Sequence, residues 1–214
     1  MQITYYGHSC FLLTSSSGVT VLTDPFTRVG YEMPKGLKAD VVTVSHAHFD
    51  HSHTAGVQAG RVISQAGEYV EKGVEIVGFS TYHDEKKGAL RGENTVFIIK
   101  MDGLTVCHFG DVGEPYSEKF ADKCKGADVF LLPVGGTYTV NATQAKEYVE
   151  NLKPKRVIPM HFKPSDGALD IEGVESFLRL FEEKDIVRIR QGLVELSAEE
   201  LHDDFGVIYL ERVK

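Results

Sequence analysis

Directly after the apolar run Val41-Val42-Thr43-Val44, the chain reads Ser45-His46-Ala47-His48-Phe49-Asp50-His51-Ser52-His53. The β-branched run predicts a buried strand, and the histidine-rich segment (residues 45–53) begins where that strand ends. Imidazole and carboxylate groups are ligands that zinc and other first-row metals favour. Functional groups commonly lie at the end of a strand, at the rim of its sheet. The segment therefore predicts a metal site at a sheet edge.

The spacing within this segment indicates two positions for cations. His46 and His48 are two residues apart, so in extended chain their side chains point the same way. Asp50 and His51 are adjacent, and both can face one point only if the chain leaves the strand there. We therefore predict one metal ion held partly by His46 and His48 and a second held by Asp50 and His51. The alternative is a histidine-rich surface loop that binds nothing, which this order of residues directly after a strand disfavours.

The order His-x-His-x-Asp-His resembles the signature of the metallo-β-lactamase superfamily, and the resemblance extends along most of the chain. That family has metal-binding motifs at five places, and this sequence has a match for each in the same order. The matches are Asp24 in Leu22-Thr23-Asp24-Pro25, the segment above, His83 in Ser80-Thr81-Tyr82-His83-Asp84, Asp111 in Phe109-Gly110-Asp111, and His161 in Ile158-Pro159-Met160-His161-Phe162. A finer resemblance is to a small single-domain branch that includes the ascorbate-6-phosphate lactonase. It is carried by Gly7-His8-Ser9 and by Leu132-Pro133-Val134-Gly135-Gly136.

The resemblance implies a role for each matched residue. Three residues would complete each metal site: His46, His48 and His83 the first, and Asp50, His51 and His161 the second. Asp111 would bridge the two ions with one carboxylate oxygen on each. Asp50 would also orient the nucleophile, and His8 would either protonate the leaving group or support the site structurally. Asp24 would hold a ligand imidazole by a hydrogen bond, which ligating histidines usually require.

For two of these matches the residues leave an alternative open. His83 follows a predicted strand and could be a polar residue satisfied by its neighbours. His161 lies between Met160 and Phe162, so it could be a buried structural histidine. The implied cofactor is a pair of divalent metal ions. Zinc suits these nitrogen and oxygen ligands first, and manganese and iron are alternatives.

Length and sequence pattern predict the fold class. We expect residues 1–214 to form one domain with a substantial core. Apolar, β-branched runs predict strands in the first half, around a loop at 26–38, at 3–6, 10–14, 19–23, 41–45, 61–64, 74–80, 95–100 and 104–109. The second half predicts helices at 116–125, 141–152 and 171–184, and strands at 129–132, 156–159 and 205–213. This order predicts an α+β or layered α/β fold, and the resemblance specifies a four-layer αββα sandwich.

Charge, cysteine content and hydropathy bear on partners and location. The net charge of −8 disfavours nucleic acid and anionic membranes as partners. Three cysteines without a Cys-x-x-Cys pair argue against a disulfide framework and favour a reducing compartment. No apolar run is long enough to cross a bilayer, and residues 1–6 lack the pattern of a signal peptide. We therefore expect a cytoplasmic protein. The sequence leaves its oligomeric state open.

The complete order of ligand motifs favours a metal-dependent hydrolase. Two divalent ions about 3.5–4 Å apart can share one water and lower its pKa, so that a metal-bridging hydroxide becomes the nucleophile. The expected substrate is a small anionic ester, lactone or phosphodiester. A nuclease that acts on RNA is the first alternative, because relatives of that kind share the ligands, but the acidic charge disfavours it. The second alternative is a metal-binding module without catalytic activity.

Overall fold

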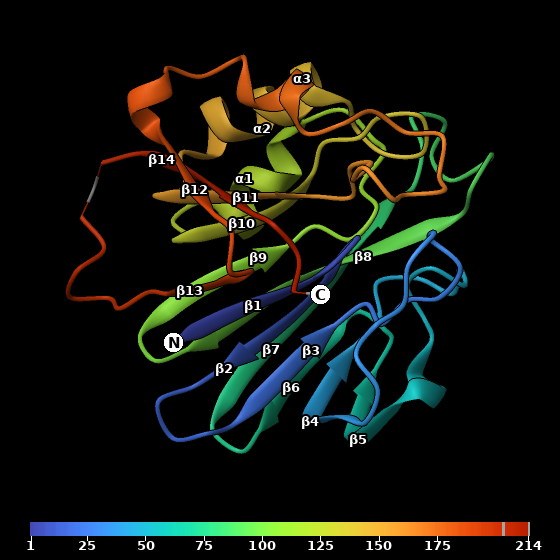
Figure 1. The fold of residues 1–214 in the computed structure, drawn as a ribbon, viewed down its shortest axis with the longest axis vertical. Coiled ribbons are helices and arrows are strands. Elements are labelled where there is room, and N and C mark those ends of the chain that lie inside the picture. The colour runs from blue at the N-terminus through green and yellow to red at the C-terminus, as the bar shows by residue number, and fades with distance from the viewer. Residues whose placement is uncertain (203, 214) are drawn as a thin grey trace.

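The structure, a computed structural model, describes residues 1–202 and 204–213. Two β-sheets lie face to face, and helices cover the outer face of the larger sheet (Figure 1). Apolar side chains fill the space between the sheets, where Phe11 and Phe97 are fully buried. Phe130 is fully buried on the other face of the larger sheet, beneath the helices. The first half of the chain builds mostly strands, and the α-helices of the described residues all come from the second half.

The smaller sheet is built mainly from the N-terminal strands. In spatial order its described strands are β13 (Leu193–Glu195), β1 (Gln2–Gly7), β2 (Cys10–Thr14), β3 (Thr20–Thr23), β4 (Leu37–Thr43) and β5 (Val57–Ile63). β1, β2 and β3 pair antiparallel, whereas β3, β4 and β5 run parallel. The carboxyl ends of β3 and β4 therefore meet at one edge of the sheet.

The larger sheet combines an antiparallel and a parallel half. In spatial order its described strands are β12 (Ile186–Ile189), β14 (Gly206–Leu210), β11 (Arg156–Met160), β10 (Val129–Pro133), β9 (Leu104–His108), β8 (Glu93–Met101), β7 (Val74–Tyr82) and β6 (Gly67–Glu71). β6 to β9 pair antiparallel, and β9, β10, β11, β14 and β12 run parallel. Every side chain of β10 is buried, as expected for a strand covered on both faces.

The helices over the larger sheet are α1 (Glu118–Cys124), α2 (Ala142–Leu152) and the single turn α3 (Glu175–Leu178). The start of α2 is fixed by a capping box, in which Asn141 and Gln144 exchange hydrogen bonds between side chain and backbone. Its end is fixed by Lys153, which adopts a left-handed conformation directly before Pro154. The predicted start and end of this helix are thereby confirmed.

A loop covers the outer face of the smaller sheet. Phe26 and Val29, from the segment between β3 and β4, are buried against Leu22 and Val42 of these strands. The layered α/β fold predicted from the order of elements and the sandwich of two sheets implied by the resemblance are confirmed. Of the two outer layers of the expected αββα arrangement, the described residues form one with helices and the other with this loop. Burial of the loop's aromatic ring explains how a segment without periodicity still holds a fixed position.

Several predicted elements differ from the structure. The helix expected at 171–184 is only α3 followed by a 3₁₀ turn (Glu183–Asp185). Val174 offers no side-chain cap, and the apolar side chains spaced like a helix face instead anchor irregular chain, with Phe181 stacked on Phe205 at 5.4 Å. β6, β12 and β13 were not predicted, because short edge strands are half exposed and carry little apolar pattern. β4 and β5 begin earlier than expected, at residues 37 and 57.

The fold brings the predicted site residues to one end of the sandwich. Asp24 follows β3 and the histidine-rich segment follows β4 in the smaller sheet. In the larger sheet, β7 and β9 both run antiparallel to β8 and so point the same way, as does β11. His83, Asp111 and His161 follow the ends of these three strands. Ligand motifs far apart in sequence therefore converge where the carboxyl ends of strands from both sheets meet.

Candidate metal centre

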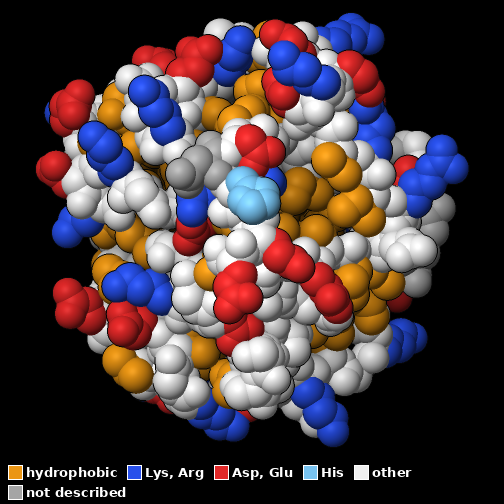
Figure 2. All heavy atoms as spheres, turned by 90° about the vertical axis from the view of Figure 1, so that its left-hand side faces the viewer, with side chains coloured by type: hydrophobic (Ala, Val, Ile, Leu, Met, Phe, Trp, Pro, Cys, Tyr) orange, Lys and Arg blue, Asp and Glu red, His pale blue; other side chains and the backbone are white. Residues whose placement is uncertain are grey.

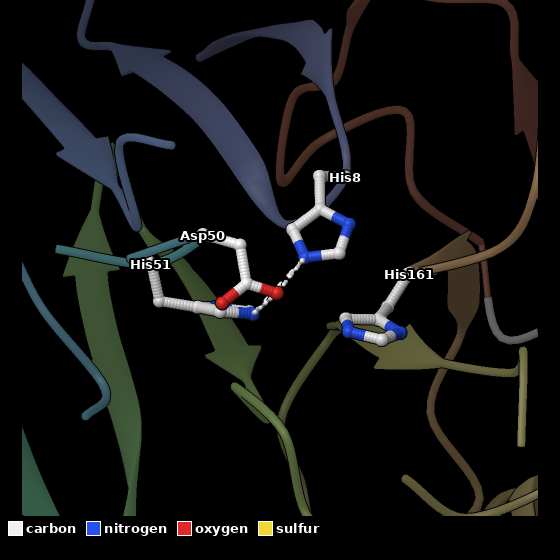
Figure 3. Close-up of side chains that lie close together, drawn as sticks. All are labelled: His8, Asp50, His51 and His161. Carbon is white, nitrogen blue, oxygen red and sulfur yellow. Dashed lines mark hydrogen bonds and ion pairs between the residues drawn. The ribbon is translucent and has the colours of Figure 1, made fainter. Parts of the chain in front are cut away.

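The predicted ligand residues gather into two adjoining groups. The open group consists of His46, His48 and His83, whose ligand nitrogens lie within 4.8 Å of one another. The buried group consists of His8, Asp50, His51 and His161, whose ligand nitrogen and oxygen atoms also lie within 4.8 Å of one another. Figure 3 shows these side chains converging from separate parts of the chain, with the neighbours Asp50 and His51 coming from the same loop and His8 and His161 from two others. His48 is exposed, whereas His8, His51 and His161 are at most 1 % exposed, so solvent reaches the cluster through the open group.

Asp111 lies between the two groups. Its Oδ2 atom is 3.2 Å from Nε2 of His51, 3.2 Å from Nε2 of His161 and 3.3 Å from Nε2 of His83. Nε2 of His46 is 3.9 Å from the same oxygen. One carboxylate oxygen thus faces nitrogens of both groups, which is the arrangement expected of a ligand shared by two cations.

Hydrogen bonds fix the imidazole tautomers so that Nε2 faces the cluster. Ser45 Oγ donates to Asp24 at 2.6 Å, so its contact with His46 Nδ1 at 2.9 Å requires the histidine nitrogen to donate. His51 Nδ1 donates to the same Asp24 carboxylate at 2.8 Å. His83 Nδ1 donates to the carbonyl of Tyr138 at 3.0 Å. In each case the proton is held on Nδ1, which leaves the lone pair on Nε2 for a metal ion.

Backbone geometry also supports the site. Asn94 Oδ1 accepts a hydrogen bond from the Asp111 N–H at 2.8 Å, and its amide group donates to Phe109 and Thr81. This buried side chain fixes the turn that carries Asp111. Gly110 has a φ of 53°, and a Cβ there would lie 2.3 Å from Asn94 Oδ1, so only glycine fits.

Two ligand-group residues adopt an uncommon backbone conformation. His8 and His161 have φ values of 54° and 51°, and the His161 N–H donates to the His8 carbonyl at 2.8 Å. The centres of their imidazole rings lie 4.2 Å apart. Left-handed backbone costs free energy in residues other than glycine, and such strain concentrates at functional sites. The two segments hold each other in the conformation that points both rings into the cluster.

Several buried polar atoms in the cluster have no hydrogen-bond partner among residues 1–202 and 204–213. They are Nε2 of His46, Oδ1 of Asp111, and both ring nitrogens of His161. A buried polar atom without a partner is costly unless another group satisfies it. These atoms all belong to residues around Oδ2 of Asp111, and their types suit divalent first-row cations. The donor set therefore fits metal ions in both groups.

The electrostatics agree with such a site. Burial lowers the pKa of His46 well below its usual value and that of His8 to about 4, so both rings are neutral near pH 7. Burial alone would raise the pKa of Asp111, but the neighbouring imidazoles of His161 and His51 lower it well below its usual value. His51 differs: although burial lowers its pKa, the carboxylates of Asp111 and Asp24 raise it well above its usual value. A cation that binds Nε2 of His51 must therefore displace a proton, as is usual when metals bind histidine.

The structure brings together every residue that the sequence predicted for the site. Asp24 lies behind the ligands and contacts His51, as predicted. Ser45, Asn94 and the Tyr138 carbonyl were not assigned roles in holding ligands. Ser45 stands next to the first histidine of the motif, and that position was a usable signal. The other two act from segments distant in sequence, so only the fold reveals their contacts.

The comparisons with known proteins agree with the fold and the site. A family model described as the beta-lactamase superfamily domain matches residues 2–161. A metal-dependent hydrolase of Thermococcus kodakarensis is 31% identical over 226 residues, with 92% of this chain and 99% of that protein covered. A metal-dependent hydrolase of Pyrococcus furiosus is 32% identical over 192 residues, with 76% of this chain and 84% of that protein covered. A solved Thermotoga maritima structure, for which Zn-dependent hydrolysis is suggested, has a TM-score of 0.81 at 36% identity, with 100% of this chain and 99% of that one covered.

The matched residues include every ligand motif from Asp24 to His161. The chain therefore belongs to the metallo-β-lactamase superfamily. Within that superfamily it is an enzyme of the metal-dependent hydrolase class.

Proposed function

We propose that this hydrolase binds two divalent cations and cleaves a small anionic ester, lactone or phosphodiester. The observation that supports two ions, and not one, is the position of Asp111 Oδ2 between the open and the buried group. His46, His48 and His83 would hold one ion, and Asp50, His51 and His161 the other. The lactone preference rests on the resemblance at residues 7–9 and 132–136 alone.

When bound, the pair of cations would lower the pKa of a shared water and polarise the oxygen of the scissile group. The chain's own residues then provide orientation. Asp50 Oδ2 accepts a hydrogen bond from His8 Nε2 at 3.1 Å, which fixes the carboxylate beside the cluster. A carboxylate held in this way can accept a hydrogen bond from the attacking water and set its direction. We assign Asp50 this catalytic role.

His8 has two candidate roles within this proposal. Its Nε2 lies 3.1 Å from both Asp50 Oδ2 and His51 Nε2, and its ring is buried. The bond to Asp50 supports a positioning role, in which the neutral ring donates to the carboxylate. Protonation of the leaving group by His8 is the alternative. A pKa lowered to about 4 by burial disfavours it, because the ring holds no extra proton near neutral pH.

Zinc is the proposed metal, because histidine nitrogens dominate the donor set and zinc binds them with carboxylate oxygens readily. Manganese and iron remain alternatives with the same ligands. We also propose a cytoplasmic location, which the three unpaired, buried cysteines support. None of the described helices is long and apolar enough to span a membrane.

The charge distribution supports a small substrate over RNA. The net charge is −8, and on the face in Figure 2 acidic and basic side chains are interspersed without a continuous basic surface. Proteins that bind nucleic acid usually concentrate lysine and arginine on one face. The nuclease hypothesis can be tested by RNA binding across a salt titration, since phosphate contacts weaken steeply with salt.

The proposed function is tested by elemental analysis of protein purified without added metal, followed by assays of the reconstituted enzyme. We expect about two equivalents of a divalent metal per chain and hydrolysis of at least one ester, lactone or phosphodiester. Removal of the metal by a chelator should abolish that activity, and addition of zinc should restore it. Activity that persists in metal-free protein would overturn the proposal.

A further inference from the structure

We propose that Arg91 binds an anionic group of the substrate beside the open group, so that the preferred ester or lactone carries a carboxylate or phosphate next to its scissile bond. This role rests on the proposed function, and Arg91 is the side chain that would bind the substrate's negative charge. Three features support it: the loop that carries Arg91, the partner of its guanidinium and the charges that surround it.

The loop from residue 84 to residue 92 (the Asp84 loop) is held rigidly. The carboxylate of Asp84 is 1 % exposed and accepts hydrogen bonds from four backbone N–H groups. Those groups belong to Lys86, Gly88, Leu90 and Arg91, at 2.8 to 3.0 Å. A loop organised around one buried carboxylate keeps its backbone in place. Arg91 therefore occupies a fixed position without having to pair its own side chain.

The Asp84 loop lies next to the open group. Its first residue directly follows His83, and the Gly92 carbonyl at its end accepts a hydrogen bond from the His83 N–H at 3.1 Å. Both ends of the loop thus meet at a ligand residue. The Arg91 side chain also reaches the turn that holds the other side of that ligand. Its Cζ lies 5.6 Å from the centre of the Tyr138 ring, and the Tyr138 carbonyl accepts from His83 Nδ1.

The guanidinium of Arg91 has no anionic partner within residues 1–202 and 204–213. Neither a hydrogen bond nor an ion pair to its side chain occurs there, although the ring of Tyr138 lies against it. Other arginines, such as Arg61 and Arg188, pair with glutamates. Lys86 and Lys87 add positive charge to the same loop, which also carries Glu85 and the buried Asp84, so that its formal net charge is +1. Arg91 is a half-buried residue on a rigid loop that adjoins a ligand residue, and the donors of its guanidinium are free among the described residues. Such a group is suited to bind a carboxylate or a phosphate.

The test compares Arg91→Gln with Arg61→Gln in zinc-reconstituted enzyme. Arg61 is a matched control, because it also lies over a tyrosine ring, 5.3 Å from Tyr69, but on the β5 and β6 edge. The probes are p-nitrophenyl acetate, which is neutral, and the mono-p-nitrophenyl ester of glutarate, which carries a carboxylate. We expect Arg91→Gln to raise KM for the anionic ester by about tenfold or more, as loss of a charge-assisted hydrogen bond predicts. Its kcat, and both constants for the neutral ester, should change less than about twofold, and Arg91→Lys should recover part of the loss.

Equal KM ratios for the two glutamine variants would overturn the proposal. So would an equal fall in kcat for both esters with Arg91→Gln, because that result indicates a structural role. Calorimetric titration with glutarate and with inorganic phosphate provides a measurement independent of turnover, and it distinguishes carboxylate from phosphate selectivity. If the wild type hydrolyses neither ester, the proposed function fails for these substrates. Anion binding that is weakened by Arg91→Gln alone would then still support the anion site, and unchanged binding would refute it.

Discussion

The open and the buried group use the same chemistry in different surroundings. In the buried group, His8, His51 and His161 are almost fully enclosed, and His51 also pairs with the buried Asp24. In the open group, His48 is exposed, and the buried ring of His83 donates from Nδ1 to a carbonyl and not to a carboxylate. An enclosed ion loses its ligands only if the fold opens, whereas an ion at the surface can exchange ligands with solvent and substrate. On the proposed function, we therefore expect the buried group to hold its cation more tightly and the open group to face the substrate.

Substitution of Asp111, which faces both groups, should have the largest effect on metal binding and activity. Asp111→Asn removes the negative charge from the oxygen that faces both groups. We expect both cations to bind more weakly and hydrolysis to fall by about a thousandfold or more, since metal catalysis contributes several kcal/mol of transition-state stabilisation. Elemental analysis and steady-state kinetics measure the two effects. Full metal content with normal activity would show that Asp111 does not bridge.

Removal of one histidine from each group should affect stability and metal content differently in the two groups. His51→Ala leaves Asp24 buried without its imidazole partner, and we expect a loss of about 3 kcal/mol in the free energy of unfolding together with loss of metal. His48→Ala changes an exposed side chain, so stability should change by less than about 0.5 kcal/mol while the open group loses its ion. Urea denaturation and metal analysis of both variants provide the measurement. Equal destabilisation by the two variants would contradict the difference between the groups.

Two buried carboxylates near the site allow a sharper test of ligand support. Asp24 accepts from His51 and Ser45, whereas Asp84 accepts only from backbone N–H groups. Asp24→Asn should weaken metal binding by about 10-fold to 100-fold, which is typical for loss of a group that orients a ligand. Asp84→Asn should instead cost about 1–3 kcal/mol of stability and leave metal affinity within about threefold of the wild type. Competition with a fluorescent zinc chelator measures the affinity, and equal losses would refute the distinction.

The sequence was sufficient for the ligands but not for everything that holds them. His46, His48, Asp50 and His51 are close in sequence, so their spacing alone predicts a site. The distant motifs converge because each follows the carboxyl end of a strand, and β3 runs parallel to β4 as β9 does to β11. This arrangement of strands could be expected from the family resemblance, but not from the periodicity of the sequence. Asn94 lies on β8 and binds the turn after β9, a contact set by strand register that no local pattern encodes. Short edge strands escaped prediction for the same reason, because pairing and not propensity defines them.

The smallest predicted effect concerns a link between the two groups. Ser45 donates to Asp24 and accepts from His46, so one carboxylate fixes a ligand of the open group through Ser45 and a ligand of the buried group directly. Ser45→Ala removes the indirect link alone. We expect it to weaken the open group's ion by about three- to tenfold, because His46 loses the hydrogen bond that holds its ring, without changing the buried group's ion. Stepwise metal titration by calorimetry resolves the two events, and Ser17→Ala, a serine distant from the cluster, is the matched control. If Ser45→Ala weakened both ions equally, Asp24 and Ser45 would act as one unit and the two groups would not be independent.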